Sequence, residues 1–171
     1  MKRINKKGSA QDLIYIAVVL LSFAIICVLG YMIAGEFNDH VQSDDKFNAT
    51  NAPNARSAST QLLNYYPTVV DNMYLFLAVA LCIGALLMAA MVRVHPMFIA
   101  LFFVTWIFII FLCGILSNTY QELAANPMLA TEANNMIVMS TIMEYLPLFI
   151  GVFGIILMVV MYKSYQGAQD Y

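Results

Sequence analysis

Few side chains in this sequence could carry out chemistry. The 171 residues include two histidines, His40 and His95, and three cysteines, Cys27, Cys82 and Cys113. The two histidines cannot build a metal site with the usual ligand spacing. Each cysteine lies in a different apolar run, which is typical of a small packing residue and not of a disulfide framework.

Motifs of the common enzyme classes are missing as well. The sequence has no glycine-rich loop that would bind phosphate or a dinucleotide, and no nucleophile elbow of the hydrolase type. We therefore predict no catalytic residue, no cofactor and no metal, and a protein that is not an enzyme.

The composition indicates a membrane protein. Hydrophobic residues make up 62% of the chain and charged residues 11%, with a formal net charge of −2. Soluble domains are about 45–50% apolar and about 25% charged. The weakly acidic balance also lacks the basic surface of a nucleic-acid-binding protein, so we expect no sequence-specific nucleic-acid partner.

Four runs without a charged side chain are each long enough, at about 20 residues, to cross the hydrocarbon core as helices. We predict an all-α integral membrane protein with transmembrane helices at 13–34, 73–93, 97–117 and 146–163. Because the uncharged runs contain no Asp, Glu, Lys, Arg or His, and Arg93 and Lys163 lie only at the ends of two spans, the sequence argues against a proton-coupled transporter, a voltage sensor and an intramembrane protease.

Lysine and arginine set the expected orientation, since they stay on the cytoplasmic side of short loops. With both termini inside (N-in/C-in), the inner side comprises the tails 1–12 and 164–171 and the turn 94–96. Six of the eight cations are then inside, four in the tail 1–12 and two at the span ends, Arg93 and Lys163, and only two lie outside. The first span is then a retained signal anchor. The short inner turn predicts that the second and third spans are antiparallel neighbours.

The first outer segment, 35–72, is expected to be a polar loop. It starts acidic and continues through small and polar residues that cannot offset their own ordering entropy, so it is either flexible or held by a partner. Asn48 begins an Asn-Ala-Thr glycosylation pattern.

The second outer segment, 118–145, is expected to contain an interfacial helix with Thr131 as its N-cap, running into the last span with a kink at Pro147. Met136, Met139 and Met143 follow helical spacing along this helix. Such a stripe either packs on the bundle or the headgroups, or faces a partner protein.

Small residues at helical spacing let helix backbones approach closely. They serve either packing within the bundle or formation of a homo-oligomer. The helix-packing candidates are Gly30, Ala34, Ala80, Gly84, Ala85, Ala89, Gly151 and Gly154.

The segment from Lys6 to Asp12, followed at once by an apolar run, resembles the short basic starts of small membrane proteins from tailless icosahedral viruses that enclose a lipid membrane in a capsid. It is also similar to the processing site of archaeal prepilins, but four apolar runs replace the single pilin helix and Asp12 lies too near Gly8. The viral resemblance covers only this amino-terminal segment. It implies a virion protein that occupies the internal membrane and offers its outer loops to the capsid.

Together these patterns favour a non-enzymatic structural or scaffolding protein, in a viral internal membrane or a host cell membrane. Its expected partners are the lipid bilayer and other membrane or capsid proteins. A pore-forming or holin-like protein, assembled as a homo-oligomer, and an accessory subunit of a larger membrane complex are the alternatives.

Overall fold

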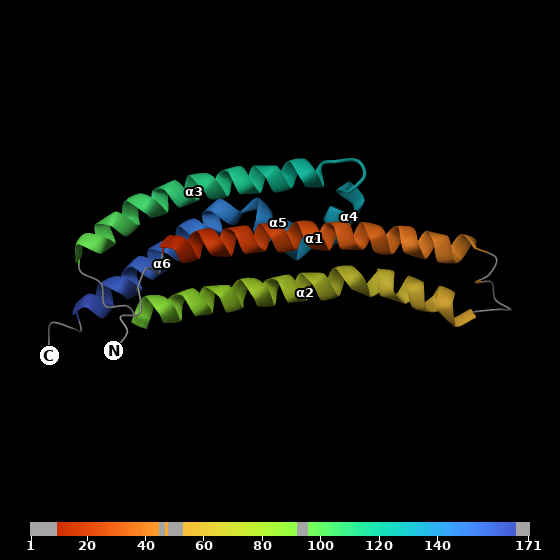
Figure 1. Ribbon diagram of the computed structural model, residues 1–171, viewed down its shortest axis with the longest axis horizontal. Coiled ribbons are helices and arrows are strands. Elements are labelled where there is room, and N and C mark those ends of the chain that lie inside the picture. The colour runs from red at the N-terminus through yellow and green to blue at the C-terminus, as the bar shows by residue number, and fades with distance from the viewer. Residues whose placement is uncertain (1–9, 45–46, 48–52, 92–95, 167–171) are drawn as a thin grey trace, which may run out of the picture.

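The computed structural model describes residues 10–44, 47, 53–91 and 96–166, and its regular structure there is helical (Figure 1). The elements are α1 (Ala10–Ser43), α2 (Pro53–Met91), α3 (Pro96–Ala124), α4 (Ala130–Asn135), α5 (Ile137–Glu144) and α6 (Leu146–Gln166).

Four of these helices are long and apolar enough to cross a membrane. The stretches that qualify are Gln11–Ser43, Asn54–Met91, Ile99–Ala124 and Leu146–Lys163. The predicted all-α chain with four candidate spans is thereby confirmed, whereas the N-in/C-in orientation stays a prediction.

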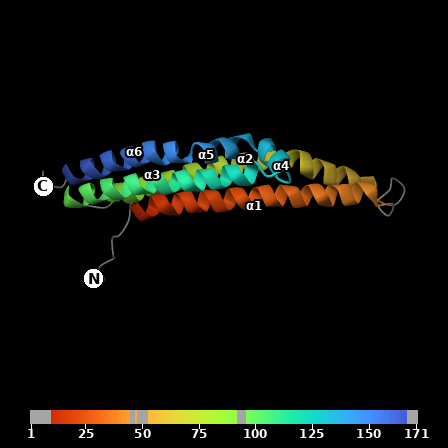
Figure 2. The same cartoon turned by 90° about the horizontal axis from the view of Figure 1, so that it is seen from above.

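The long helices form two pairs. α1 packs along α2 and α3 along α6, and the pairs join through contacts of α1 with α3 and of α2 with α6 (Figures 1 and 2). The prediction that the second and third spans are neighbours was wrong, because the described parts of α2 and α3 lie diagonally across the bundle, each in contact with α1 and α6. The turn 94–96 falls almost wholly outside the described residues.

The two pairs are displaced along the bundle axis. We call the end of the bundle at Ser43, Pro53 and Ala124 the outer end, after the predicted orientation. There α1 and α2 continue as a helical hairpin well past α3, whereas at the other end α1 begins part-way along α3 and α6 (Figure 1). At about 1.5 Å per residue, α1 is about 51 Å long and α2 about 58 Å, against a hydrocarbon core of about 30 Å.

Most of the predicted outer loop 35–72 is therefore helical, and that prediction was wrong. α1 extends to Ser43 and α2 begins at Pro53, continuing through Pro67. The two helices order each other: the rings of Tyr31 and Tyr66 stack with centroids 5.2 Å apart, and polar side chains join the outer ends. These contacts offset an ordering entropy that neither segment could offset alone. Asn48 lies outside the described residues.

The predicted interfacial helix is broken twice. Its first part, α4, is preceded by Leu129 and has no side-chain cap, so Thr131 is not the N-cap. Met136 separates α4 from α5, and Tyr145 separates α5 from α6. Pro147 is then the second residue of α6, where a helix tolerates proline because the amide N–H that it lacks would have no partner in the first turn.

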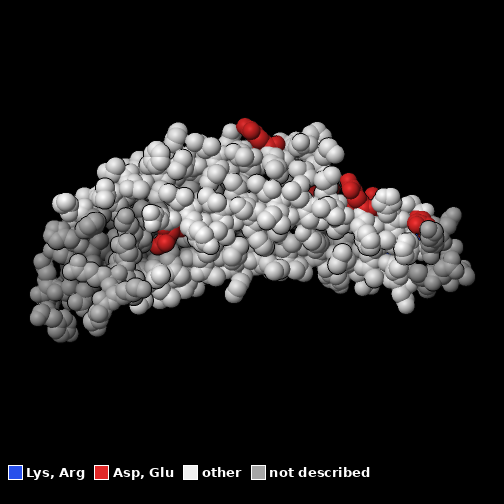
Figure 3. All heavy atoms as spheres, viewed as in Figure 1, with Lys and Arg blue, Asp and Glu red and all other residues white. Residues whose placement is uncertain are grey.

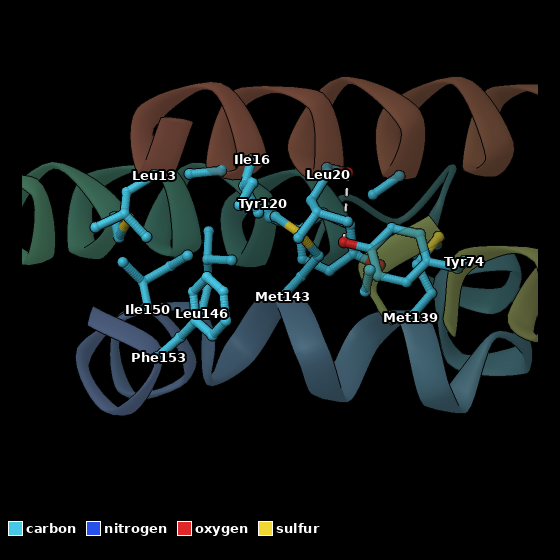
Figure 4. Close-up of a cluster of buried hydrophobic side chains, with 14 of the residues drawn as sticks. Leu13, Ile16, Leu20, Tyr74, Tyr120, Met139, Met143, Leu146, Ile150 and Phe153 are labelled. Atoms are coloured by element: carbon cyan, nitrogen blue, oxygen red, sulfur yellow. Dashed lines mark hydrogen bonds between the residues drawn. The ribbon is translucent and has the colours of Figure 1, made fainter. Parts of the chain in front are cut away.

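The core runs along the line where the four long helices and α5 meet (Figure 4). Met136, Met139 and Met143 are each 0% exposed, so the stripe packs inside the bundle and does not face a partner. The largest fully buried side chains are Leu13, Ile16, Leu20, Tyr74, Ile109, Tyr120, Met136, Met139, Met143, Leu146, Ile150 and Leu157.

Candidate functional site

Asp71 of α2 holds the beginning of α5. One carboxylate oxygen accepts a hydrogen bond from the backbone N–H of Val138 at 3.1 Å, and the other accepts one from Met139 at 3.0 Å. The break at Met136 leaves these N–H groups without partners inside a helix, and a carboxylate at a helix N-terminus satisfies them with favourable charge. Asp71 thus caps a helix that lies 67 residues further along the chain.

Hydroxyl groups complete a polar layer around α5. Tyr120 and Ser140 share a hydrogen bond at 3.0 Å, and the Ser140 hydroxyl donates to the Ala133 carbonyl at 2.8 Å, just before the break at Met136. Ser117 donates to the Glu144 carbonyl at 2.9 Å, at the second break. These bonds satisfy carbonyls that a continuous helix would have paired.

Tyr74 ties this polar layer to α1 by donating to the carbonyl of Leu20 at 3.4 Å (Figure 4). We define the polar layer by Asp71, Tyr74, Ser117, Tyr120 and Ser140. Its polar groups bind backbone atoms or one another and so hold the two broken helix ends in place.

The outer ends of α1 and α2 form a second polar region, which we call the outer hairpin (residues 36–43 and 53–63). The Asn38 amide oxygen accepts hydrogen bonds from Ser59 at 3.0 Å and Thr60 at 3.4 Å. Gln42 donates to the Thr60 hydroxyl at 3.0 Å and to the Arg56 carbonyl at 3.1 Å. The bonds cross between the helices and keep the hairpin closed.

Replacing Asn38 with alanine should loosen this hairpin without unfolding the bundle. The single hydroxyl protons of Ser59 and Thr60 can then be donated to the Arg56 carbonyl instead. Only the hydrogen bond between the helices is lost, at a cost of about 1 kcal/mol. Hydrogen–deuterium exchange should then be about fivefold faster in the outer hairpin and unchanged in α6. Asn64→Ala, at an exposed site of α2, is the control; equal exchange in the two variants would contradict the role of this hydrogen bond.

The predicted small-residue sites divide between the interior and the surface. A Cβ atom on Gly30 would stand 2.5 Å from the Tyr66 hydroxyl, and one on Gly154 would overlap the Trp106 indole. Gly84, in contrast, faces open space. Ala85 and Ala89 are buried, Ala34 and Gly151 are half-buried, and Ala80 is exposed.

Asp12 is the residue that sequence reasoning placed least well. It was expected at the inner end of the first span, but it lies within α1 beside a shallow hollow of about 180 Å³ that Ala80, Gly84 and Met88 of α2 also line. Ala80 and Gly84 are in the middle of the α2 apolar run, so Asp12 lies level with this run and not beyond its end. Asp71 lies in a candidate span as well.

The remaining reactive side chains stay dispersed in the part of the chain that the structure describes. Cys27 and Cys113 are buried, Cys82 is half-buried, and His40 is exposed near the end of α1, while His95 falls outside the described residues. No three His, Cys, Asp or Glu side chains among the described residues are grouped so that they could hold a metal ion.

No protein-family model, curated protein or solved structure matches the chain. Indications of function therefore come from the polar layer and the outer hairpin.

Proposed function

We propose that the chain is a non-enzymatic structural membrane protein whose outer hairpin docks another protein. The observation that carries this proposal is the length of α1 and α2, which project past the outer end of α3 as an ordered helical hairpin (Figure 2). A helix pair closed by its own hydrogen bonds presents side chains at a fixed distance from the membrane, which suits a docking element.

The charge on the outer hairpin favours a basic partner surface. Glu36 and Asp39 are exposed on α1, and the described cation nearby, Arg56, is half-buried and donates to the Asp44 carbonyl at 3.2 Å. Figure 3 shows carboxylates over this end of the molecule. Electrostatic complementarity would then steer the partner and set its register.

The resemblance of the amino-terminal segment suggests the setting. We propose an internal viral membrane, in which the outer hairpin faces the capsid and the bundle fixes that contact to the bilayer. In a host cell membrane, the same hairpin would instead hold the subunits of a larger complex.

Cross-linking from the hairpin tests the proposal. Ser57 is exposed on the outer hairpin. Lys163 is exposed near the C-terminal end of α6, at the other end of the bundle, so Ser57→Cys and Lys163→Cys form a matched pair. A water-soluble maleimide–benzophenone reagent, applied to purified particles or membranes of the source and followed by mass spectrometry, should attach Ser57→Cys to one capsid or membrane protein that Lys163→Cys does not reach.

Adducts with lipid alone would overturn the docking role, and adducts only with a second copy would replace it by self-association. Absence of the protein from purified particles would remove the viral setting.

A pore assembled from several copies is the second candidate, because Ala80 and Gly84 lie exposed on the outside of the bundle. Small residues on a lipid-facing surface allow close helix contact between copies. Reconstitution into planar bilayers should give ion conductance that Gly84→Leu abolishes. A silent bilayer at high protein density would exclude the pore.

A further inference from the structure

The polar layer fixes how far each helix extends toward the outer side. Its hydrogen bonds connect Tyr74 of α2 with Leu20 of α1 and Tyr120 of α3 with Ser140 of α5, so Leu20 and Tyr120 mark the height of the polar layer on α1 and α3. Beyond this height α1 continues through residues 21–43, about 35 Å, whereas α3 continues only through residues 121–124, about 6 Å. The two helix pairs therefore present their apolar surfaces at different heights.

On the α3 side, the apolar surface ends below the polar layer. Phe111 is 66% and Ile115 51% exposed, and then Asn118, bonded to the exposed Glu122 at 3.1 Å, begins a polar end. Exposed Glu144 marks the same limit beside α6. The hydrocarbon boundary on this side must lie near Ile115, because a charged side chain is costly inside hydrocarbon.

On the α1 side, the apolar surface continues well past the polar layer. Ile26 and Ile33 are each 66% exposed, and the first exposed charge beyond them is Glu36. α2 adds Val69 and Tyr65, which are 51% and 68% exposed. Soluble proteins rarely leave so large a continuous apolar surface in water.

Two apolar hollows along this side indicate what covers it. One of about 600 Å³ and one of about 490 Å³ lie end to end between α1 and α2 and share Phe23 and Met73. Along α2 they extend from Leu77 to Ala58. They continue, without an intervening charge, the surface that Phe76 presents at the level of the bilayer. An elongated apolar trough that is continuous with a bilayer-facing surface fits lipid acyl chains.

We propose that the bilayer meets this protein at unequal heights, with lipid acyl chains covering the α1–α2 side out to Ile33 and the α3–α6 side only to Ile115. Either the bundle is tilted in the membrane, or the bilayer is locally thicker beside α1 and α2 than beside α3 and α6. Membranes accommodate both arrangements. The inference needs only the membrane insertion of the bundle and not the docking role.

Ile26 and Asn118 give a decisive comparison. Ile26 lies further toward the outer end than Asn118, and yet we expect Ile26 to face lipid and Asn118 to face water. Along α1, Ile26 lies six residues (about 9 Å) beyond Leu20, and along α3, Asn118 lies two residues (about 3 Å) before Tyr120. In a Trp106→Phe background, which removes the single native tryptophan, Ile26→Trp and Asn118→Trp are reconstituted into vesicles of brominated or ordinary phosphatidylcholine. Iodide is present on both sides of the membrane.

Ile26→Trp should lose most of its fluorescence in brominated lipid and little to iodide, as a Phe108→Trp control on the lipid-facing side of α3 does. Asn118→Trp should show the opposite pattern. Quenching of Ile26→Trp by iodide would place the outer half of α1 in water and overturn the proposal. Quenching by neither agent would mean that protein covers the site, and lipid quenching of both variants would mean a level bilayer placed further out; each result also overturns it.

Discussion

Replacing Asp71 with alanine is expected to lower the stability of the bundle by about 2 to 3 kcal/mol, because two backbone N–H groups at the start of α5 lose a charged acceptor at once. For a chain of this size, that loss lowers the melting temperature by about 5 to 10 °C. A thiol-reactive dye can follow the unfolding in detergent micelles, since Cys27 and Cys113 are buried in the folded protein and become reactive on heating.

The charge and geometry of this cap can be separated by a second substitution. Asp71→Asn keeps one acceptor oxygen and should lose about half as much stability as Asp71→Ala, because an amide accepts one of the two bonds. Glu122→Ala, which removes an exposed carboxylate that accepts a hydrogen bond from Asn118 of the same helix, is the control and should change stability little. Equal melting temperatures for Asp71→Ala and Glu122→Ala would contradict the capping role.

The lateral order of the helices could be predicted only in part from the sequence. Apolar runs of membrane length located all four candidate spans, because hydropathy reports the environment around a helix. It does not report the offset between helices along the axis. The offset depends on bonds such as Tyr74 to Leu20, which join residues 54 positions apart, and it brings Asp12 beside the α2 apolar run.

The sequence did not predict the helical form of the outer hairpin or the helix breaks at Met136 and Tyr145, for a related reason. Residues 36–43 and 53–63 have compositions typical of loops, and their helical form depends on interhelical bonds such as that from Ser59 to Asn38. The spacing of Met136, Met139 and Met143 correctly placed them on one face, but a face buried in the bundle and one that meets a partner have the same spacing. Asp71, which caps α5, had no signal in the sequence beyond being an acid at the end of an apolar run.

The contact of Gly154 with Trp106 is the second point at which a small change should have a large effect. The Trp106 indole lies against the backbone of Gly154 and its N–H donates to the Ile150 carbonyl at 3.4 Å, so it joins α3 to α6 in the membrane-spanning region. A methyl group on residue 154 would overlap the ring, which must leave its place and give up this hydrogen bond. Overpacking of this kind costs about 1 to 3 kcal/mol for a methyl group, and the larger Gly154→Leu should exceed that range.

Gly154→Ala should therefore lower the melting temperature by several degrees and shift the emission of Trp106, the single tryptophan of the chain. Gly84→Ala is the matched control: its site faces open space, and alanine favours a helix more than glycine, so its stability should be equal or higher. In a double-mutant cycle, Trp106→Phe should restore part of the stability lost in Gly154→Ala, because the smaller ring leaves room for the methyl group. Additive losses in that cycle would show that Gly154 acts through helix propensity alone and not through contact with Trp106.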